Sequence, residues 1–323
     1  MFNKIKIINC VFIDNNLLTL CCRTDLHFPL PDFVPGPRPV ETTARHKNKR
    51  VVRISEHQVA GQKEAFFCNV TSSVVLADGR VVLCDDSNSK LKMMNPKLEF
   101  MFELDLDSNP LNLAQVSDKR LAVSIPGLRQ VVFVDICPKE FQLSGSIKTR
   151  RDCWGVEVLD NVVIVTTGRD GHSVIMYDME GTEVNSFLLT AHADENIRCP
   201  VAVTADRKKR HLYITCTGGA WSKGCVVKVD LQGTLLQVFN DPEIDTPRTC
   251  TLDKHGKLYI CALESSTVYQ ISPSGELFRL FPSKTDQVVG PLHLNFVPNF
   301  HIRFILTEVA SDTLKLFELP TGK

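Results

Sequence analysis

The chain of 323 residues lacks the features of a membrane protein, a nucleic-acid-binding tail or a zinc module. No apolar stretch approaches the roughly 20 residues that span a bilayer. Lysine plus arginine and aspartate plus glutamate each total 37, so no net charge draws the chain toward nucleic acid or anionic lipid. No CxxC pair is present to begin a zinc or redox motif. We therefore expect no membrane and no DNA partner, and any basic binding site must be local.

Motifs for catalysis are missing as well. The sequence has no nucleophile elbow, no glycine-rich loop that would cradle a phosphate and no HExxH pattern. The glycine-containing stretches Gly168–Gly171 and Gly218–Gly219 are most simply loops. The sequence therefore predicts no catalytic residue, no cofactor and no bound metal.

Twelve cysteines are many for such a chain, but their pattern does not indicate disulfides. Cys84, Cys216 and Cys261 lie inside short β-branched runs, where a thiol behaves as a small buried hydrophobe. The apolar stretch from residue 7 to residue 20 is interrupted by Asp14 and its two neighbours, and no small-residue cleavage site follows it, so it does not indicate a secretory signal. We expect reduced thiols and a cytoplasmic location.

The composition is that of a folded protein, with 43% hydrophobic and 23% charged residues. The beginning of the chain differs from the rest. Five prolines lie between Pro29 and Pro39, and a polar run from Glu41 to Arg50 follows them. We predict a poorly ordered N-terminal segment and linker over residues 1–49, and one folded domain over residues 50–323.

Short β-rich runs separated by turn residues recur through that domain at a period of about 45 residues. Each unit holds two strongly hydrophobic runs, and pairs such as Asp78–Gly79 and Ser274–Gly275 supply the positive φ that tight turns require. The first run of each unit is centred in turn on Leu83, Val123, Ile164, Ile214, Ile260 and Ile305. The sequence thus predicts six similar units.

These six units predict an all-β fold, a six-bladed β-propeller of four-stranded antiparallel blades. A single four-stranded sheet cannot bury both of its faces, but six arranged radially cover one another. The last unit ends at Leu319 without an outer strand, and the run from Arg50 to Ile54 supplies one from the N-terminal side. We expect this strand to pair with the last blade and close the ring. The alternative is an unrelated leading strand in a two-sheet sandwich.

The stretch from Asp86 to Met94 resembles the NHL signature, in which an acidic residue and Asn precede a His-Arg-Ile-like step into an apolar strand. Ser89 stands where that family has His, and Lys90 where it has Arg. The other five repeats keep only the hydrophobic skeleton, as in the stretch from Ser311 to Leu316. Together with the blade count, the chain resembles the C-terminal NHL-type propeller of tripartite-motif proteins over residues 50–323.

The resemblance implies a recognition domain, because the propeller of tripartite-motif ubiquitin ligases recognises substrates. Ligase activity is not carried over, since the zinc-binding RING and B-box modules of that family are built from closely spaced Cys and His pairs. Before the propeller, this sequence offers only Cys10, Cys21 and Cys22, without the partner spacing and without the heptads of a coiled coil. We therefore expect a non-enzymatic module.

Candidate binding residues gather before the innermost strands and in the loops between second and third strands, which meet on one face of a propeller. Arg and Trp are over-represented at binding hot spots, and the same pair suits stacking on unpaired bases. The predicted binding residues are Arg151, Trp154, Arg169, Arg198, Trp221, Lys223 and Arg248. The basic run from Arg207 to Arg210 belongs to a hairpin at the opposite face.

Three functions follow from these residues. Binding of a protein or peptide partner leads, because the net charge is zero. RNA binding through the same face is the alternative, as the resemblance implies for some family members. The third is a metal-dependent hydrolase of the lactonase type, with a divalent cation in the central channel. Its candidate ligands on the inner strands are Asn69, Asn112, Glu157 and Asn295.

Overall fold

A computed structural model describes residues 47–49, 51–61, 64–189, 197–218, 224–281, 288–298 and 302–320. The chain divides into two units, Met1–Gly36 and Pro37–Lys323, and every described residue belongs to the second. The predicted N-terminal segment over residues 1–49 lies outside the described residues, apart from its last three.

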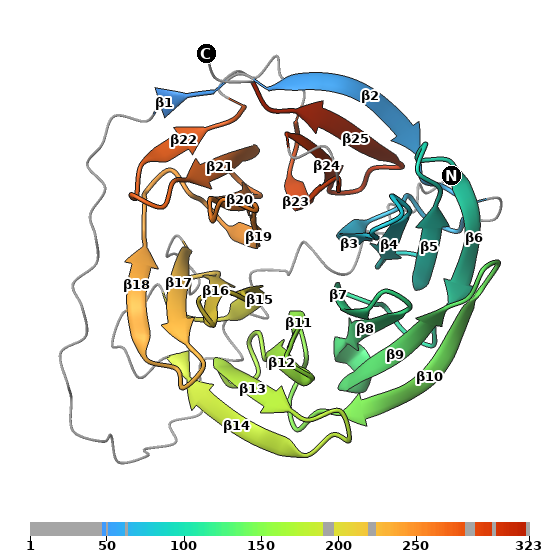
Figure 1. Ribbon diagram of the computed structural model, residues 1–323, viewed down its shortest axis with the longest axis horizontal. Coiled ribbons are helices and arrows are strands. Elements are labelled where there is room, and N and C mark those ends of the chain that lie inside the picture. The colour runs from blue at the N-terminus through green and yellow to red at the C-terminus, as the bar shows by residue number, and fades with distance from the viewer. Residues whose placement is uncertain are drawn as a thin grey trace, which may run out of the picture. The chain divides into compact units, whose positions relative to one another are not determined.

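The second unit is a ring of six blades (Figure 1). Each blade is a sheet that contains four antiparallel strands, counted from the central channel outward. The strands of blades 1 to 3, from innermost to outermost, are β3 (Val70–Val75), β4 (Val81–Asp85), β5 (Lys90–Met94) and β6 (Phe100–Asp105); β7 (Asn112–Ser117), β8 (Arg120–Ile125), β9 (Gln130–Ile136) and β10 (Phe141–Lys148); β11 (Val156–Leu159), β12 (Val162–Thr166), β13 (Ser173–Tyr177) and β14 (Glu183–Leu188). A short 3-10 helix, η1 (Pro126–Leu128), lies between β8 and β9.

Blades 4 to 6 repeat this arrangement, and the predicted six-bladed propeller is confirmed. Their strands are β15 (Pro200–Asp206), β16 (His211–Cys216), β17 (Cys225–Asp230) and β18 (Leu235–Phe239); β19 (Pro247–Leu252), β20 (Leu258–Ala262), β21 (Thr267–Ile271) and β22 (Leu277–Arg279); β23 (Pro291–Phe296), β24 (Arg303–Glu308), β25 (Thr313–Glu318) and, outermost, β2 (Val52–Gln58). Every hydrophobic run used to count the units lies on the second strand of its blade.

The ring closes as predicted, with an N-terminal strand on the outside of the last blade. β2 pairs antiparallel with β25, in a register that sets Val52 opposite Glu318 and Gln58 opposite Thr313. A second strand from the same segment was not predicted. β1 (Lys47–Asn48) lies parallel to β22 and makes blade 5 a five-stranded sheet. Residues 47–58 therefore tie the ends of the described chain together across two blades.

Apolar side chains from neighbouring blades form the core between the sheets. β4, β13 and β20 are buried along their whole length, whereas β14 alternates between exposed and half-buried residues. This difference follows from position, because an outermost strand has one face toward solvent. Turns also pack tightly. Gly233 has φ +87°, and a Cβ there would lie 2.4 Å from the Phe187 ring, so only glycine fits.

The nine described cysteines form no disulfide with one another. Seven of them are buried, and burial raises the pKa of Cys153 to about 11 and that of Cys261 to about 12. Cys84, Cys216 and Cys261, which the sequence predicts as small buried hydrophobes, are at most 1% exposed. Within the described ranges, no helix has both the length and the apolar character needed to cross a bilayer.

Candidate binding face

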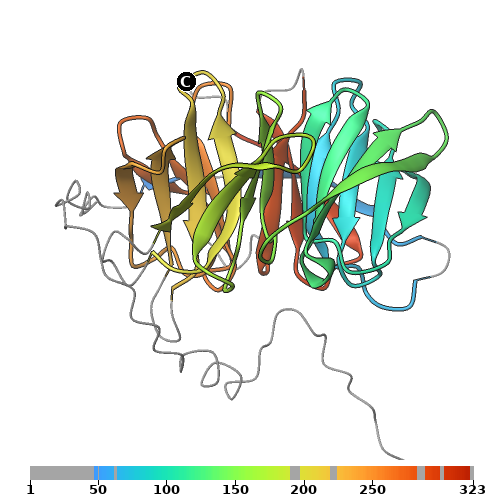
Figure 2. The same ribbon diagram turned by 90° about the horizontal axis from the view of Figure 1, so that it is seen from below.

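The six innermost strands run in one direction, so the ring has two distinct loop-bearing faces (Figure 2). We call proximal the face that carries the segments before the innermost strands and the loops between second and third strands. The distal face carries the remaining turns. The basic run from Arg207 to Arg210 lies in the turn between β15 and β16, on the distal face, as predicted.

Two of the predicted residues are exposed on the proximal face. Arg169 lies in the loop between β12 and β13, and Arg198 precedes β15 on the next blade. Neither side chain makes a hydrogen bond or ion pair with another described residue. Their guanidinium groups are therefore available as donors toward the solvent side, each with a planar set of N–H groups suited to carboxylates or phosphates.

Two other arginines on this face are ion-paired. Arg151, a predicted residue, contacts Asp170 with 3.2 Å between its guanidinium nitrogen and a carboxylate oxygen. Arg129, which the sequence analysis missed, lies 3.0 Å from Asp152 and 3.3 Å from Asp170. All four groups are at least partly exposed, so these pairs orient side chains more than they stabilise the fold. They also neutralise part of the positive charge.

His172 joins the loops that carry these arginines. Its Nδ1 accepts a hydrogen bond of 3.1 Å from the backbone N–H of Cys199, which follows Arg198. Burial lowers the pKa of His172, and the charges of Arg198 and Arg151 lower it further. The imidazole is therefore neutral at pH 7 and holds the segment before β15 against the loop between β12 and β13.

Trp154 serves as a packing group on this face. Its indole lies directly against Gly168, where a Cβ would come within 2.5 Å of the ring. Its backbone N–H donates to the carbonyl of Thr166, and its carbonyl accepts from the hydroxyl of Ser124 on blade 2. The half-buried indole therefore packs on the loop of its own blade, and the Trp154 backbone links that blade to blade 2.

None of the remaining predicted residues adds a further exposed side chain beside Arg169 and Arg198 within the described part of the chain. Arg248 is half-buried and is the second residue of β19, so it lies within the strand instead of before it. Its carbonyl accepts a hydrogen bond of 3.2 Å from the hydroxyl of Thr215 on blade 4. Trp221 and Lys223 lie outside the described residues. We call Arg129, Arg151, Arg169 and Arg198, on blades 2 to 4, the basic sector.

The innermost strands enclose a central cavity of about 270 Å³ with a mainly polar lining. His293 on β23 contacts Ser73 on β3, with 3.0 Å between Nδ1 and the hydroxyl oxygen. Burial lowers the pKa of His293 to about 4, so the ring is neutral at pH 7. Asn295 donates a 2.8 Å hydrogen bond to the carbonyl of Ser73. These contacts join the last blade to the first.

Three of the four candidate metal ligands line this channel, namely Asn112, Glu157 and Asn295. The Asn112 amide oxygen accepts from the N–H of Val156, and Glu157 accepts from the N–H of Ala205 and pairs with Arg207. Enclosure raises the pKa of Glu157, although Arg207 and the backbone donors oppose the shift. These oxygens link neighbouring blades.

The fourth candidate ligand, Asn69, does not line the channel. It precedes β3 on the proximal side, where its side-chain amide donates to Asp86 and its oxygen accepts from the N–H of Ala310. The prediction of a shared site with the three channel residues is therefore wrong for Asn69. The residue belongs instead to a buried polar cluster on blade 1.

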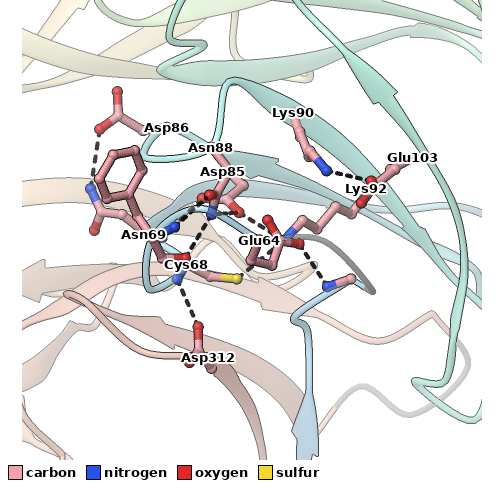
Figure 3. Close-up of polar contacts among 12 residues, drawn as sticks. Glu64, Cys68, Asn69, Asp85, Asp86, Asn88, Lys90, Lys92, Glu103 and Asp312 are labelled. Atoms are coloured by element: carbon pink, nitrogen blue, oxygen red, sulfur yellow. Dashed lines mark hydrogen bonds and ion pairs between the residues drawn. The ribbon is translucent and has the colours of Figure 1, made fainter.

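That cluster surrounds Lys92, a fully buried residue of β5 (Figure 3). The ammonium lies 2.6 Å from Glu64, 2.7 Å from Asp85 and 3.1 Å from the thiol of Cys68. Burial by itself lowers the pKa of Lys92, but the hydrogen bonds and charges of its two carboxylate partners outweigh burial and raise it. Lys92 is therefore charged at neutral pH.

The ligand atoms of Glu64, Cys68 and Asp85 lie within 4.8 Å of one another, a grouping that in itself resembles a cation site. The Lys92 ammonium contacts all three and provides the positive charge. The cluster therefore fixes the connection between β2 and β3 to the first blade. Asp312 of blade 6 completes this junction by accepting the N–H of Cys68 at 2.7 Å.

Comparisons with known proteins support the fold. No family model matches the chain, and no curated protein matches its sequence. Among solved structures, a streptogramin B lyase aligns with a TM-score of 0.59 and 14% identity, covering 83% of this chain and 88% of the lyase. The likeness is one of fold. The virginiamycin B lyase of Staphylococcus aureus aligns with a TM-score of 0.58 and 11% identity, over 82% of this chain and 99% of that one.

A third neighbour is the Swd1 β-propeller domain of Myceliophteria thermophila, with a TM-score of 0.56 and 9% identity over 78% of this chain and 84% of that one. The neighbours thus include two lyases and a domain described only as a β-propeller. At such identities they establish the propeller architecture of this chain, and the NHL resemblance stays an expectation.

Proposed function

We propose that this chain is a non-catalytic recognition module that binds a protein partner through the basic sector of its proximal face. The observation that carries the proposal is the pair of exposed arginines, Arg169 and Arg198, on neighbouring blades. Arginine is enriched where proteins bind, and a rigid ring of blades presents both side chains in a fixed relation. The resemblance to the recognition propeller of tripartite-motif proteins supports the same function.

The surroundings of the two arginines favour an acidic protein segment over RNA. Asp170 accepts ion pairs from both Arg129 and Arg151, and Asp152 contacts Arg129. A long polyphosphate would meet these carboxylates at close range, and like charges repel. A short acidic segment of a protein brings fewer negative charges close to these carboxylates than a polyphosphate does. RNA binding is therefore the outcome that competes with protein binding in the test.

The channel gives less support to hydrolysis. Asn112, Glu157 and Asn295 each hold a neighbouring strand through a backbone hydrogen bond. A reaction centre built from them would have to release those bonds, which join blades. The fold neighbours that are lyases do not change this point, because fold alone does not carry an activity.

The proposal is tested by affinity capture with the full chain, followed by quantitative mass spectrometry of bound proteins and sequencing of bound RNA. We compare the natural chain with an Arg169→Ala/Arg198→Ala variant, and with a Lys139→Ala/Lys254→Ala variant of exposed distal residues. We expect specific proteins that the distal variant retains, that the proximal variant loses, and that survive nuclease treatment. Capture that depends on nuclease-sensitive RNA, or that the proximal variant leaves unchanged, contradicts the proposal.

A further inference from the structure

The proximal face is divided by charge. On the half of the face opposite the basic sector, blades 5 and 1, which flank blade 6, carry exposed carboxylates that we call the acidic sector. Its exposed members are Glu243 and Glu264 on blade 5, and Asp105 and Asp107 at the end of blade 1. Because the blades follow one another in order around the ring, blade 6 lies opposite blade 3 (Figure 1). The two sectors therefore occupy opposite halves of one face.

The acidic sector also exposes two adjacent aromatic side chains. Phe66 and Phe67, in the connection from β2 to β3, are 52% and 66% exposed. Neighbouring exposed phenylalanines on a soluble domain are typical of an interaction site. The basic sector has an apolar counterpart in Leu128, which is 42% exposed and precedes Arg129.

The loop that carries the two phenylalanines is held firmly in place. The side chain of Asn88 donates to the carbonyl of Phe66 and accepts from its N–H, both at 3.1 Å. On one side of the pair Glu64 is bound by Lys92, and on the other the N–H of Cys68 is bound by Asp312. Figure 3 shows these anchors around the start of β3. Such prior ordering reduces the entropy lost on binding.

We propose that a second copy of this chain is a partner of this face, and that the two copies associate proximal face to proximal face about a two-fold axis. An axis in the plane of the face, between the two sectors, sets the acidic sector of each copy against the basic sector of the other. The contact is isologous, so each attraction occurs twice. The inference rests on the proposed function, because it uses the same face and names one partner for it.

The same axis brings the apolar residues together. With blade 3 of one copy over blade 6 of the other, blade 1 lies over blade 2. Phe66 and Phe67 then face Leu128 and Arg129 of the partner copy. A guanidinium over an aromatic face is attractive, and burying the rings removes apolar surface from water. Complementary charges determine how the two copies are oriented, and burial of the aromatic side chains stabilises the contact between them.

A bipolar face on a chain with equal numbers of acidic and basic residues fits a second copy better than a unipolar partner. A uniformly acidic or basic partner would be attracted to one sector and repelled by the other. Two copies related by the axis set the exposed arginines of each basic sector against the acidic sector of the other, and Asp152 and Asp170 reduce this attraction without reversing it, because each is already paired with an arginine. Because the attraction is between surface charges, it should weaken as salt is added.

The test is sedimentation velocity of the full chain from about 1 to about 100 µM, at about 50 mM and about 500 mM salt. We expect a monomer–dimer equilibrium at low salt, with a dissociation constant at least about tenfold weaker at high salt. A Phe66→Ser/Phe67→Ser variant should be monomeric over the same range. A Lys139→Glu/Lys254→Glu variant, which reverses distal charges, should dimerise like the natural chain.

Charge reversal makes the test specific. An Arg169→Glu/Arg198→Glu variant and an Asp107→Arg/Glu264→Arg variant should each be monomeric alone, with unchanged thermal unfolding. A one-to-one mixture of the two should regain a dimer, because the reversed sectors match each other. A natural chain that stays monomeric at low salt, a dimer that survives the arginine reversal, or a mixture that stays monomeric would overturn the proposal. None of these results bears on the proposed function, because its capture experiment reports other proteins.

Discussion

Two groups of cations in this molecule contrast in their surroundings. Lys92 is fully buried and contacts two carboxylates and a thiol, whereas Arg169 and Arg198 are exposed and contact no charged group among the described residues. A buried ion must be compensated within the fold, and a surface ion need not be. The buried cation therefore maintains the propeller, whereas the exposed cations are accessible to a partner.

The largest expected effect on stability comes from substitution of the buried cation. Lys92→Met should lower the free energy of unfolding by about 3–5 kcal/mol, because it leaves Glu64 and Asp85 buried without their counter-charge. Urea unfolding followed by circular dichroism measures the change. The matched control is Lys47→Met, which breaks an exposed pair with Glu276 and should change nothing measurable. Equal effects of the two substitutions would contradict the contrast.

Acid should lower the stability of the protein through the buried His293. Burial lowers the pKa of His293 to about 4, well below that of an unfolded chain, so only the unfolded chain takes up this proton between about pH 6.5 and about pH 4. Stability should be constant above about pH 6.5 and fall by up to about 3 kcal/mol as the pH decreases to about 4. His293→Gln should flatten this fall, which unfolding experiments over the pH range would measure. The lowered pKa of His172 leaves a smaller dependence of the same sign.

A third substitution tests the packing of a proximal-face loop on the half-buried Trp154. Gly168 has φ +57° and contacts the Trp154 indole, so Gly168→Ala should cost about 2 kcal/mol through strain and overpacking. Gly275 also has a positive φ, but a Cβ there would meet nothing within 4 Å. Gly275→Ala is therefore the control that retains the backbone strain without the clash. Thermal unfolding and tryptophan fluorescence compare the two, and identical losses would mean that the contact with Trp154 is unimportant.

The smallest expected effect on stability is on the exposed side. Arg169→Ala/Arg198→Ala should change the free energy of unfolding by less than about 0.5 kcal/mol, because neither side chain is paired within the described fold. Denaturant unfolding measures it. A loss of several kcal/mol would show that these arginines maintain the fold, and they would then belong with Lys92.

The fold was predictable because local pattern determines it. The runs around Leu83, Val123 and Ile164 are continuous apolar strands, since second strands are buried on both faces. The closing strand followed from the missing outer strand of the last blade. The pairing of β1 with β22 was not predictable, because two residues in a polar linker carry no strand pattern.

The candidate site was only partly predictable. Counting strands was enough to place Arg151, Arg169 and Arg198 on one face, but the pairing of Arg151 with Asp170 depends on how two loops meet. Lys92 alternates with Leu91 and Met93, a pattern typical of an outward-facing residue. Its partner Glu64 comes from the connection before β3, and His293 meets Ser73 from the far end of the chain. Such contacts between distant segments leave no signal in one sequence.

The proximal face should bind protein partners and the distal face should not. The most direct measurement is site-specific photo-crosslinking in cells, with benzoylphenylalanine in place of the exposed Leu128 on the proximal face or of the exposed His255 on the distal face. We expect crosslinks to protein from position 128 and none above background from position 255. Equal crosslinking from both positions, or crosslinks from position 255 alone, would contradict this expectation.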